Sequence, residues 1–224
     1  MQGIAAVASS VDTPEVDGAA FGDGSGLVPG SRAERVAATR RRIRDAGREL
    51  FATQGYEHTT VAQIVEVAGV GLRTFYRYFP SKEHVAVEEL RRFADDAVAL
   101  IAARPSSESP IESLLAVVGV LAGRGYTKSM ALDVLLVDTI PSVAGVQHHI
   151  TMAAQDQITD VFAVRLGLSL HAIEPRAMAA VATLAYQAAA RTWLRQIEAG
   201  KQPDDLFELG RAAILYMGHG FREM

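Results

Sequence analysis

Residues 40–82 read RRRIRDAGRELFATQGYEHTTVAQIVEVAGVGLRTFYRYFPSK, and this stretch decides the fold of the N-terminal part of the chain. Its first half carries apolar residues at the spacing of one helical face: Ile43, Ala46, Leu50 and Phe51. Gly55 can take the left-handed conformation that ends a helix, and Tyr56 can then fold back onto the last turn. The stretch therefore predicts a helix that ends close to Gly55.

A second helix is predicted to begin after Thr60, because Thr60 and Gln63 have the spacing of a capping box. Its buried side would comprise Ile64, Val65 and Ala68. Gly69 breaks this helix and permits a tight turn, and Pro80 ends a third helix over residues 71–78. Two short helices joined by a glycine-containing turn are the helix-turn-helix geometry.

The third of these helices can lie in the major groove of DNA. Phe75 and Phe79 are one turn apart and should face the core. The DNA side is then left with Arg73, Thr74, Arg77 and either Tyr76 or Tyr78. A guanidinium matches the two major-groove acceptors of guanine, and phenol hydroxyls suit phosphate oxygens.

The order of residues in this unit resembles the signature of the TetR family of bacterial repressors. The matching residues are Ala68-Gly69-Val70, Thr74-Phe75-Tyr76, Phe79 and Lys82, with Leu50, Phe51, Gly55, Tyr56 and Thr60 upstream. The resemblance covers residues 40–87, roughly a fifth of the chain. It implies a helix-turn-helix head, a C-terminal helical body for ligand binding and dimerisation, and a phosphate-binding role for Lys82.

The chain departs from the family pattern at Gly71-Leu72-Arg73, where the family usually has serine followed by a small or basic pair. Glycine is a weaker helix cap than serine, and Leu72 can meet a thymine methyl group, so the operator sequence does not follow from the family. The residues expected at the DNA are Arg40, Arg44, Thr60, Gly71, Leu72, Arg73, Thr74, Tyr76, Arg77, Tyr78 and Lys82.

The arginines of the first helix leave two interpretations open. Arg40 and Arg44 share a helical face, and their position beside the recognition unit suits phosphate contact. The alternative is a solvated face with an ion pair to Glu49.

Glycines stand at the ends of the predicted helices and no segment has the alternating pattern of a strand, so we expect an all-α protein. The lack of cysteine suits the reducing cytoplasm, where we expect the protein to act. The 224 residues include no cysteine, which excludes disulfides, thiolate metal sites and thiol catalysis. No apolar run is long enough to cross a bilayer, and the first residues lack the pattern of a secretory signal, so we expect no membrane contact.

The net charge of −4 is unevenly distributed. Residues 33–92 hold eleven of the 22 basic residues and eight of the 26 acidic ones, which gives this segment +3 and the remainder −7. A locally basic surface is the electrostatic footprint of a nucleic-acid-binding protein.

We expect three parts: a disordered tail over residues 1–30, the DNA-binding domain over 31–82, and a helical regulatory and dimerisation domain over 83–224. The tail is either a passive segment or an arm that touches DNA, and its acidic residues favour the first. A capping box of Ser31 and Glu34 should start the first helix. Later helices are expected over residues 81–103, 111–123, from Thr127 to 138, 142–166, through Pro175 to 198, and 203–217.

The final two predicted helices are rich in small and apolar residues, namely Ala179, Ala180, Ala182, Ala185, Ala188, Ala189, Ala190, Leu206, Leu209, Ala213 and Leu215. They serve either the packing of one chain or a four-helix dimer interface. The family resemblance implies the homodimer, which would read a palindromic operator in double-stranded DNA.

The resemblance also implies a small-molecule effector in the body. Candidate ligand-binding residues are Phe93, Leu121, Leu135, His148, Met152, Gln155 and Phe162, with Leu114, Val118 and Asp133 nearby; the alternative is that all are core. Such a pocket would suit a lipophilic effector. The run Arg191-Thr192-Trp193-Leu194 also resembles members that bind acyl-CoA-like ligands.

No cofactor, metal or enzymatic activity is expected. His148 and His149 are adjacent on a predicted helix and point about 100° apart, so they do not chelate one ion easily. Neither a glycine-rich phosphate loop nor a nucleophile elbow is present. The sequence therefore predicts a repressor released by an effector; the alternatives are an effector-free DNA-binding dimer that organises the chromosome, and an activator.

Overall fold

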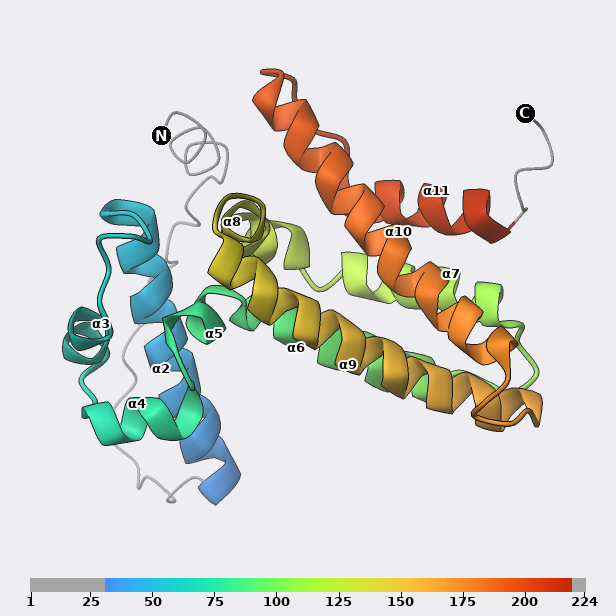
Figure 1. The fold of residues 1–224 in the computed structure, drawn as a ribbon, viewed down its shortest axis with the longest axis horizontal. Coiled ribbons are helices and arrows are strands. Elements are labelled where there is room, and N and C mark those ends of the chain that lie inside the picture. The colour runs from blue at the N-terminus through green and yellow to red at the C-terminus, as the bar shows by residue number, and fades with distance from the viewer. Residues whose placement is uncertain (1–30, 219–224) are drawn as a thin grey trace, which may run out of the picture. The chain divides into compact units, whose positions relative to one another are not determined.

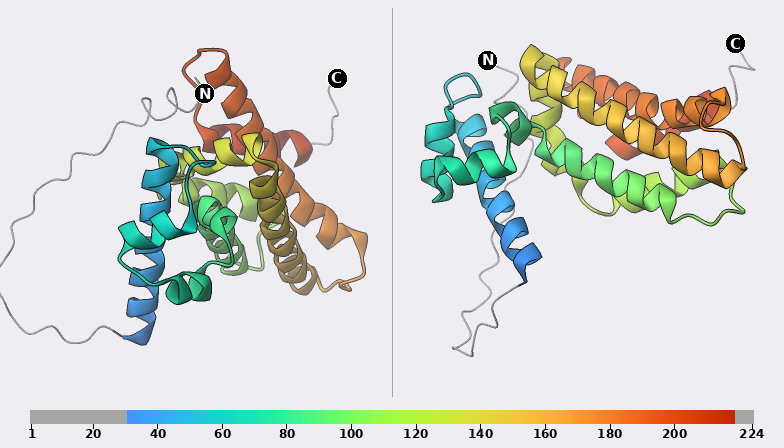
Figure 2. Two further views of the ribbon diagram at one scale, coloured as in Figure 1. Left: turned by 60° about the vertical axis from the view of Figure 1, so that its left-hand side comes forward. Right: turned by 60° about the horizontal axis from the view of Figure 1, so that its bottom comes forward.

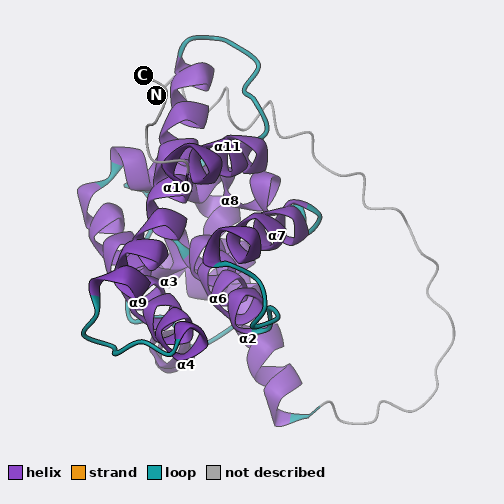
Figure 3. Ribbon diagram, turned by 90° about the vertical axis from the view of Figure 1, so that its right-hand side faces the viewer, coloured by secondary structure: helices purple, strands orange, loops and turns teal. Residues whose placement is uncertain are grey.

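The computed structural model describes residues 31–218, apart from the side chain of Lys128, and every regular element in this range is a helix (Figure 3). The predicted all-α class is confirmed. Contacts divide the chain into two compact units, Met1–Ala86 and Val87–Met224. The expected tail over residues 1–30 lies outside the described residues.

The first unit, called the head here, contains α2 (Arg32–Thr53), α3 (Val61–Ala68), α4 (Leu72–Tyr78) and α5 (Lys82–Ala86). Both predicted capping boxes form, at Ser31 with Glu34 and at Thr60 with Gln63. Gly69 has a positive φ of 62°, as the tight turn between α3 and α4 requires.

The head is held together by a core in which α2 packs against α3 and α5. Its most deeply buried side chains are Ile43, Phe51, Ile64, Phe75, Phe79 and Val85. Tyr56 folds back onto Phe51 as predicted, with 5.2 Å between the ring centroids. At Gly47 the backbone of α2 comes so close to α5 that an added Cβ would lie 2.4 Å from Val85 Cγ1.

The prediction of a single helix over residues 81–103 is wrong, because the chain forms α5 and then a separate α6 (Glu88–Ala102). Val87, with φ −114° and ψ 17°, leaves the helical conformation between them. The carboxylate of Asp133 accepts hydrogen bonds from the backbone N–H groups of Glu89 (3.0 Å) and Leu90 (3.3 Å). A distant residue thus satisfies donors that a continuous helix would have bonded internally.

The second unit consists of α6, α7 (Pro110–Ala122), α8 (Tyr126–Thr139), α9 (Pro141–Leu166), α10 (Ile173–Glu198) and α11 (Leu206–Gly218). α9 and α10, of 26 residues each, run in opposite directions beside one another (Figure 1). α6 packs on α9, while α11 packs on α10 and α7 (Figure 2).

Two predicted boundaries in this unit need correction. Thr127 does not cap α8; it lies inside the first turn, and Gly125, with φ 71°, precedes the helix. α11 starts at Leu206 rather than at residue 203, because the Asp205 carboxylate accepts hydrogen bonds from the two N–H groups of Phe207 and Glu208.

Among the described helices, none alone has the length and apolar character needed to span a membrane. Residues 129–139 of α8 and the whole of α9 meet that requirement only when combined, and a bend of 116° separates them.

Candidate functional sites: a DNA-binding helix and an apolar cavity

The recognition helix α4 presents one buried and one exposed face. Phe75 and Phe79 are fully buried, as predicted. Leu72 and Tyr76 keep about half of their surface exposed, at 51% and 56%. Gly71, Arg73 and Arg77 are also exposed, whereas Thr74 and Tyr78 are half-buried. The two phenylalanines anchor the helix, so the residues predicted to contact DNA lie on or beside its outer face.

The two arginines of α4 differ in their surroundings. Arg77 donates a hydrogen bond to the Tyr78 hydroxyl (3.3 Å), and its guanidinium lies 4.9 Å from the centroid of that ring. Arg73 has no hydrogen-bond or ion-pair partner among residues 31–218. Its guanidinium can therefore turn toward a base edge without first breaking a contact within the head.

Two arginines of α2, Arg40 and Arg44, contact other residues of the head. Arg40 donates from Nη1 to the Tyr78 carbonyl (3.3 Å) and lies 4.7 Å above the Phe79 ring, which holds the end of α4 against α2. Arg44 forms an ion pair with Asp45 (2.6 Å). Phosphate contact by Arg40 or Arg44 remains a prediction.

Lys82 secures the loop between α2 and α3. Its ammonium donates to the backbone carbonyls of Tyr56 and Thr59, both at 2.9 Å, and lies 4.0 Å from the Tyr56 ring centroid. An ammonium has three protons, so one remains for a phosphate oxygen. Thr60 is exposed beside this loop, with its hydroxyl engaged in the capping box.

Glu83 extends the same network. Burial acts to raise the pKa of Glu83, but hydrogen bonds from Ser81, its own backbone N–H and Tyr56, together with the charge of Lys82, lower it below its ordinary value overall. Glu83 is therefore charged at neutral pH and strengthens the attachment of Tyr56 to α5.

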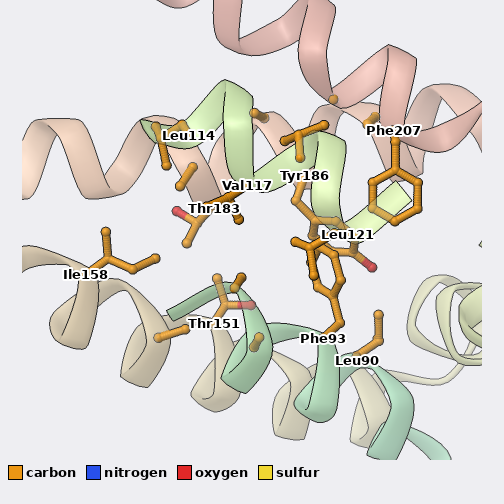
Figure 4. A pocket seen from close by; sticks show the side chains of 18 of the residues that line it. Leu90, Phe93, Leu114, Val117, Leu121, Thr151, Ile158, Thr183, Tyr186 and Phe207 are labelled. Carbon is orange, nitrogen blue, oxygen red and sulfur yellow. The ribbon is translucent and has the colours of Figure 1, made fainter. Parts of the chain in front are cut away.

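The second unit contains a cavity lined by apolar side chains from all six of its helices (Figure 4). It leaves about 110 Å³ for the centres of water-sized molecules, whereas one water needs roughly 10–15 Å³ on that measure. Among the described residues that line it, none is charged, and the polar ones are Gln147, Thr151, Thr183 and Tyr186.

The structure brings only part of the predicted ligand set to this cavity. Phe93, Leu114, Val118 and Leu121 line it. The remaining predicted residues are outside the lining, namely Asp133, Leu135, His148, Met152, Gln155 and Phe162. His148 and Met152 are on the exposed face of α9, and Phe162 is fully buried in the core.

The polar lining residues on α9 and α10 were not among the residues predicted from the sequence. Gln147, Thr151, Ala154 and Ile158 line the cavity at steps of three and four along α9. This helical spacing was the available signal, and it places His148 and Met152 on another face.

The adjacent His148 and His149 rings have centroids 6.1 Å apart, and both residues are exposed. In the part of the chain that the structure describes, no group of three or more His, Cys, Asp or Glu residues could hold a metal ion.

A helix-turn-helix head followed by a helical unit with an apolar cavity defines a class, that of one-component DNA-binding transcriptional regulators. Residues 43–88 match the family described as bacterial regulatory proteins, tetR family, and residues 129–222 match the MftR C-terminal domain. The chain belongs to the TetR family. It is thus a transcriptional regulator, a class distinct from enzymes.

Individual relatives agree with this assignment. The chain is 29% identical to the HTH-type transcriptional regulator TcmR of Streptomyces glaucescens over 174 residues, 74% of this chain and 77% of TcmR. It is 32% identical over 101 residues to the HTH-type transcriptional repressor KstR of Rhodococcus jostii, and this match spans 45% of each chain. The fold is similar to that of the FadR repressor of Thermus thermophilus, solved with lauroyl-CoA, with a TM-score of 0.54 and 23% identity over 83% of this chain and 96% of FadR.

Replacing Arg73 with alanine is expected to weaken binding to the preferred DNA site about tenfold or more, and to relax the preference at one position per half-site. Binding to random DNA should change much less. Competition titrations against a library of single-base variants would measure both effects. Lys201→Ala, which removes one positive charge from an exposed loop of the second unit, is the control. Equal loss on specific and random DNA would rule out base reading by Arg73.

Proposed function

We propose that this chain is a repressor that binds a palindromic operator as a homodimer, and that a small, largely apolar effector releases it. The observation that carries this proposal is the cavity, whose wall is almost wholly apolar and uncharged. Its wall includes α6, the helix that follows the head directly along the chain. An effector in the cavity therefore contacts the element joined to the DNA-binding unit.

The dimer half of the proposal is supported by the exposed side of α10 and α11. Ala179, Ala185 and Ala189 are buried within the unit, so internal packing already accounts for part of the alanine pattern. Leu184 and Tyr216 nevertheless remain 51% and 57% exposed. A second copy covering this face would create the two-fold axis that a palindrome requires.

Release requires two states that differ in their affinity for the effector. In the DNA-binding state, the two recognition helices are spaced for successive major grooves of operator DNA in the cytoplasm. In the other state, the effector moves α6 through its cavity-lining residues, among them Leu90 and Phe93, and the heads no longer fit.

The acyl-CoA alternative receives no support from the run around Trp193. Trp193 and Leu194 are buried outside the cavity lining, and Arg191 forms an ion pair with Asp138. The lining of the cavity, rather than this run, therefore indicates the class of effector.

The test is a genomic selection, in which purified protein is mixed with sheared host DNA and the retained fragments are sequenced. Recovery of one shared palindrome would support binding to a palindromic operator. Transcription in vitro from the promoter beside that palindrome would then distinguish repression from activation. Retention without a shared site would contradict operator binding and favour the chromosome-organising alternative. Failure to retain any DNA at low salt would contradict DNA binding.

Filling the cavity should separate DNA binding from release. Ala154→Leu places a larger side chain into the cavity from α9, and Ala153→Leu makes the same change on its exposed face. We expect Ala154→Leu to keep operator affinity within about threefold and to reduce effector affinity by at least about tenfold, since overpacking excludes the ligand. Gel-shift titrations with increasing effector would show this, and equal release of both variants would contradict the cavity as effector site.

A further inference from the structure

We infer that the effector is an electrically neutral molecule with an acceptor oxygen, such as a ketone, that is bound by the hydroxyl of Tyr186. This inference rests on the proposed function, because it assigns the chemistry of the ligand to the same cavity. It depends on the hydrogen-bonding state of the polar groups in the cavity wall.

Tyr186 lies at one end of the cavity, in a group of side chains that includes Phe93, Leu121 and Phe207 (Figure 4). Its ring centroid is 5.2 Å from that of Phe93. The residue is half-buried and belongs to the cavity wall. Its hydroxyl has no hydrogen-bond partner among residues 31–218. The hydroxyl keeps some accessible surface, because Arg165 Nη1 alone among the described side-chain nitrogen and oxygen atoms is both fully buried and without a partner. A ligand oxygen can therefore reach the hydroxyl and accept the hydrogen bond that the protein does not take.

The other polar groups of the wall are largely engaged with one another. The Thr183 hydroxyl has two acceptors for its proton, Gln155 Oε1 at 3.2 Å and the Ala180 carbonyl oxygen at 3.1 Å. Thr151 Oγ1 accepts from Gln147 Nε2 (2.7 Å), which leaves the Thr151 proton and the Gln147 carbonyl as a second, weaker polar position. Tyr186 is therefore the strongest fixed point for a polar atom of the ligand.

Charge disfavours an anionic ligand head at this end of the cavity. Burial raises the pKa of Tyr186, and the negative charge of Asp133 raises it further, so the phenol stays protonated and acts as a donor. The same burial and the same charge oppose a ligand carboxylate placed beside the hydroxyl. With no basic side chain in the described lining, nothing offsets that penalty.

The proposal is tested by titrating the full chain calorimetrically with two matched sets of probes. One set is 9-fluorenone, fluorene and fluorene-9-carboxylate; the other is cyclododecanone and cyclododecane, which samples a bulkier shape. In each set, we expect the ketone to bind about fivefold more tightly than the hydrocarbon, the difference that one neutral hydrogen bond provides. In the fluorene set, we expect the carboxylate to bind most weakly.

Two phenylalanine variants identify the group responsible. Tyr186→Phe keeps the ring and should abolish the ketone preference while leaving hydrocarbon binding unchanged. Its thermal midpoint should stay the same or rise, because it loses an unpartnered hydroxyl. Tyr126→Phe is the matched control: Tyr126 also contacts the Phe93 ring, but its hydroxyl donates to Asp96 (2.8 Å) and it is absent from the lining.

The outcomes separate this inference from the proposed function. Loss of the ketone preference in Tyr186→Phe but not in Tyr126→Phe supports the inference. A preference that survives Tyr186→Phe, or tightest binding by the carboxylate, overturns the inference, while loss of binding in Ala154→Leu would still support the cavity as effector site. If no probe of either set binds, the inference and the proposed effector site both fail.

Discussion

Replacing Lys82 with alanine should weaken binding to every DNA sequence and also lower the free energy of unfolding of the head. The ammonium holds two backbone carbonyls of the loop between α2 and α3 and lies against the Tyr56 ring. Because the site is only half-buried and water can replace part of these bonds, we expect a loss of about 2 kcal/mol. Loss of one phosphate contact should reduce the slope of log affinity against log salt by about 0.9.

The two effects are measured separately. Urea unfolding followed by circular dichroism gives the stability, and DNA titrations between about 50 and 200 mM salt, at a temperature where the variant is folded, give the slope. Lys201→Ala removes the same charge from an exposed loop and should change neither quantity. An unchanged slope would exclude a phosphate contact by Lys82, and an unchanged unfolding midpoint would exclude its role in the loop.

Replacing Gly47 with alanine is expected to destabilise the head by about 1–3 kcal/mol, although alanine is the better helix former. The added Cβ would lie 2.4 Å from Val85 Cγ1, a distance that requires α2 or α5 to move. Valine has one strongly preferred rotamer in a helix, so it cannot turn aside easily. The clash therefore outweighs the propensity gain of about 1 kcal/mol.

A matched glycine tests the sign of this effect. Gly119 also lies inside a helix, α7, but an added Cβ there meets no atom within 4 Å. Gly119→Ala should raise stability by about 0.5–1 kcal/mol. In a Val85→Ala background, Gly47→Ala should no longer destabilise, because the clashing atom is gone. If Gly47→Ala alone is as stable as the wild-type protein, then α2 and α5 have room for the added methyl group and the prediction is wrong.

Features of the head that depend on neighbouring residues could be predicted from sequence. The capping boxes at Ser31 and Thr60 each join residues three apart, and both form as predicted. Gly69 takes its positive φ because the turn needs it, whatever lies around it. Phe75 and Phe79 are buried because helical spacing places them on one side.

Features that depend on distant residues could not be predicted in this way. At the helix break at Val87, backbone N–H groups of α6 donate hydrogen bonds to Asp133, which is more than 40 residues away in the sequence. The close contact of Gly47 with Val85 likewise joins two helices that the sequence does not pair. No pattern among neighbouring residues in the sequence predicts either feature.

The sequence by itself determined the class of the protein, because the helix-turn-helix depends on caps, turns and helical spacing within residues 40–82. Only the tertiary structure decided the cavity. Apolar residues occur on several sides of α9, so composition does not show which side faces inward, and packing against α6 and α10 selects the face with Thr151. Tyr186 was no candidate from sequence, because its unpartnered hydroxyl is a property of the surrounding helices.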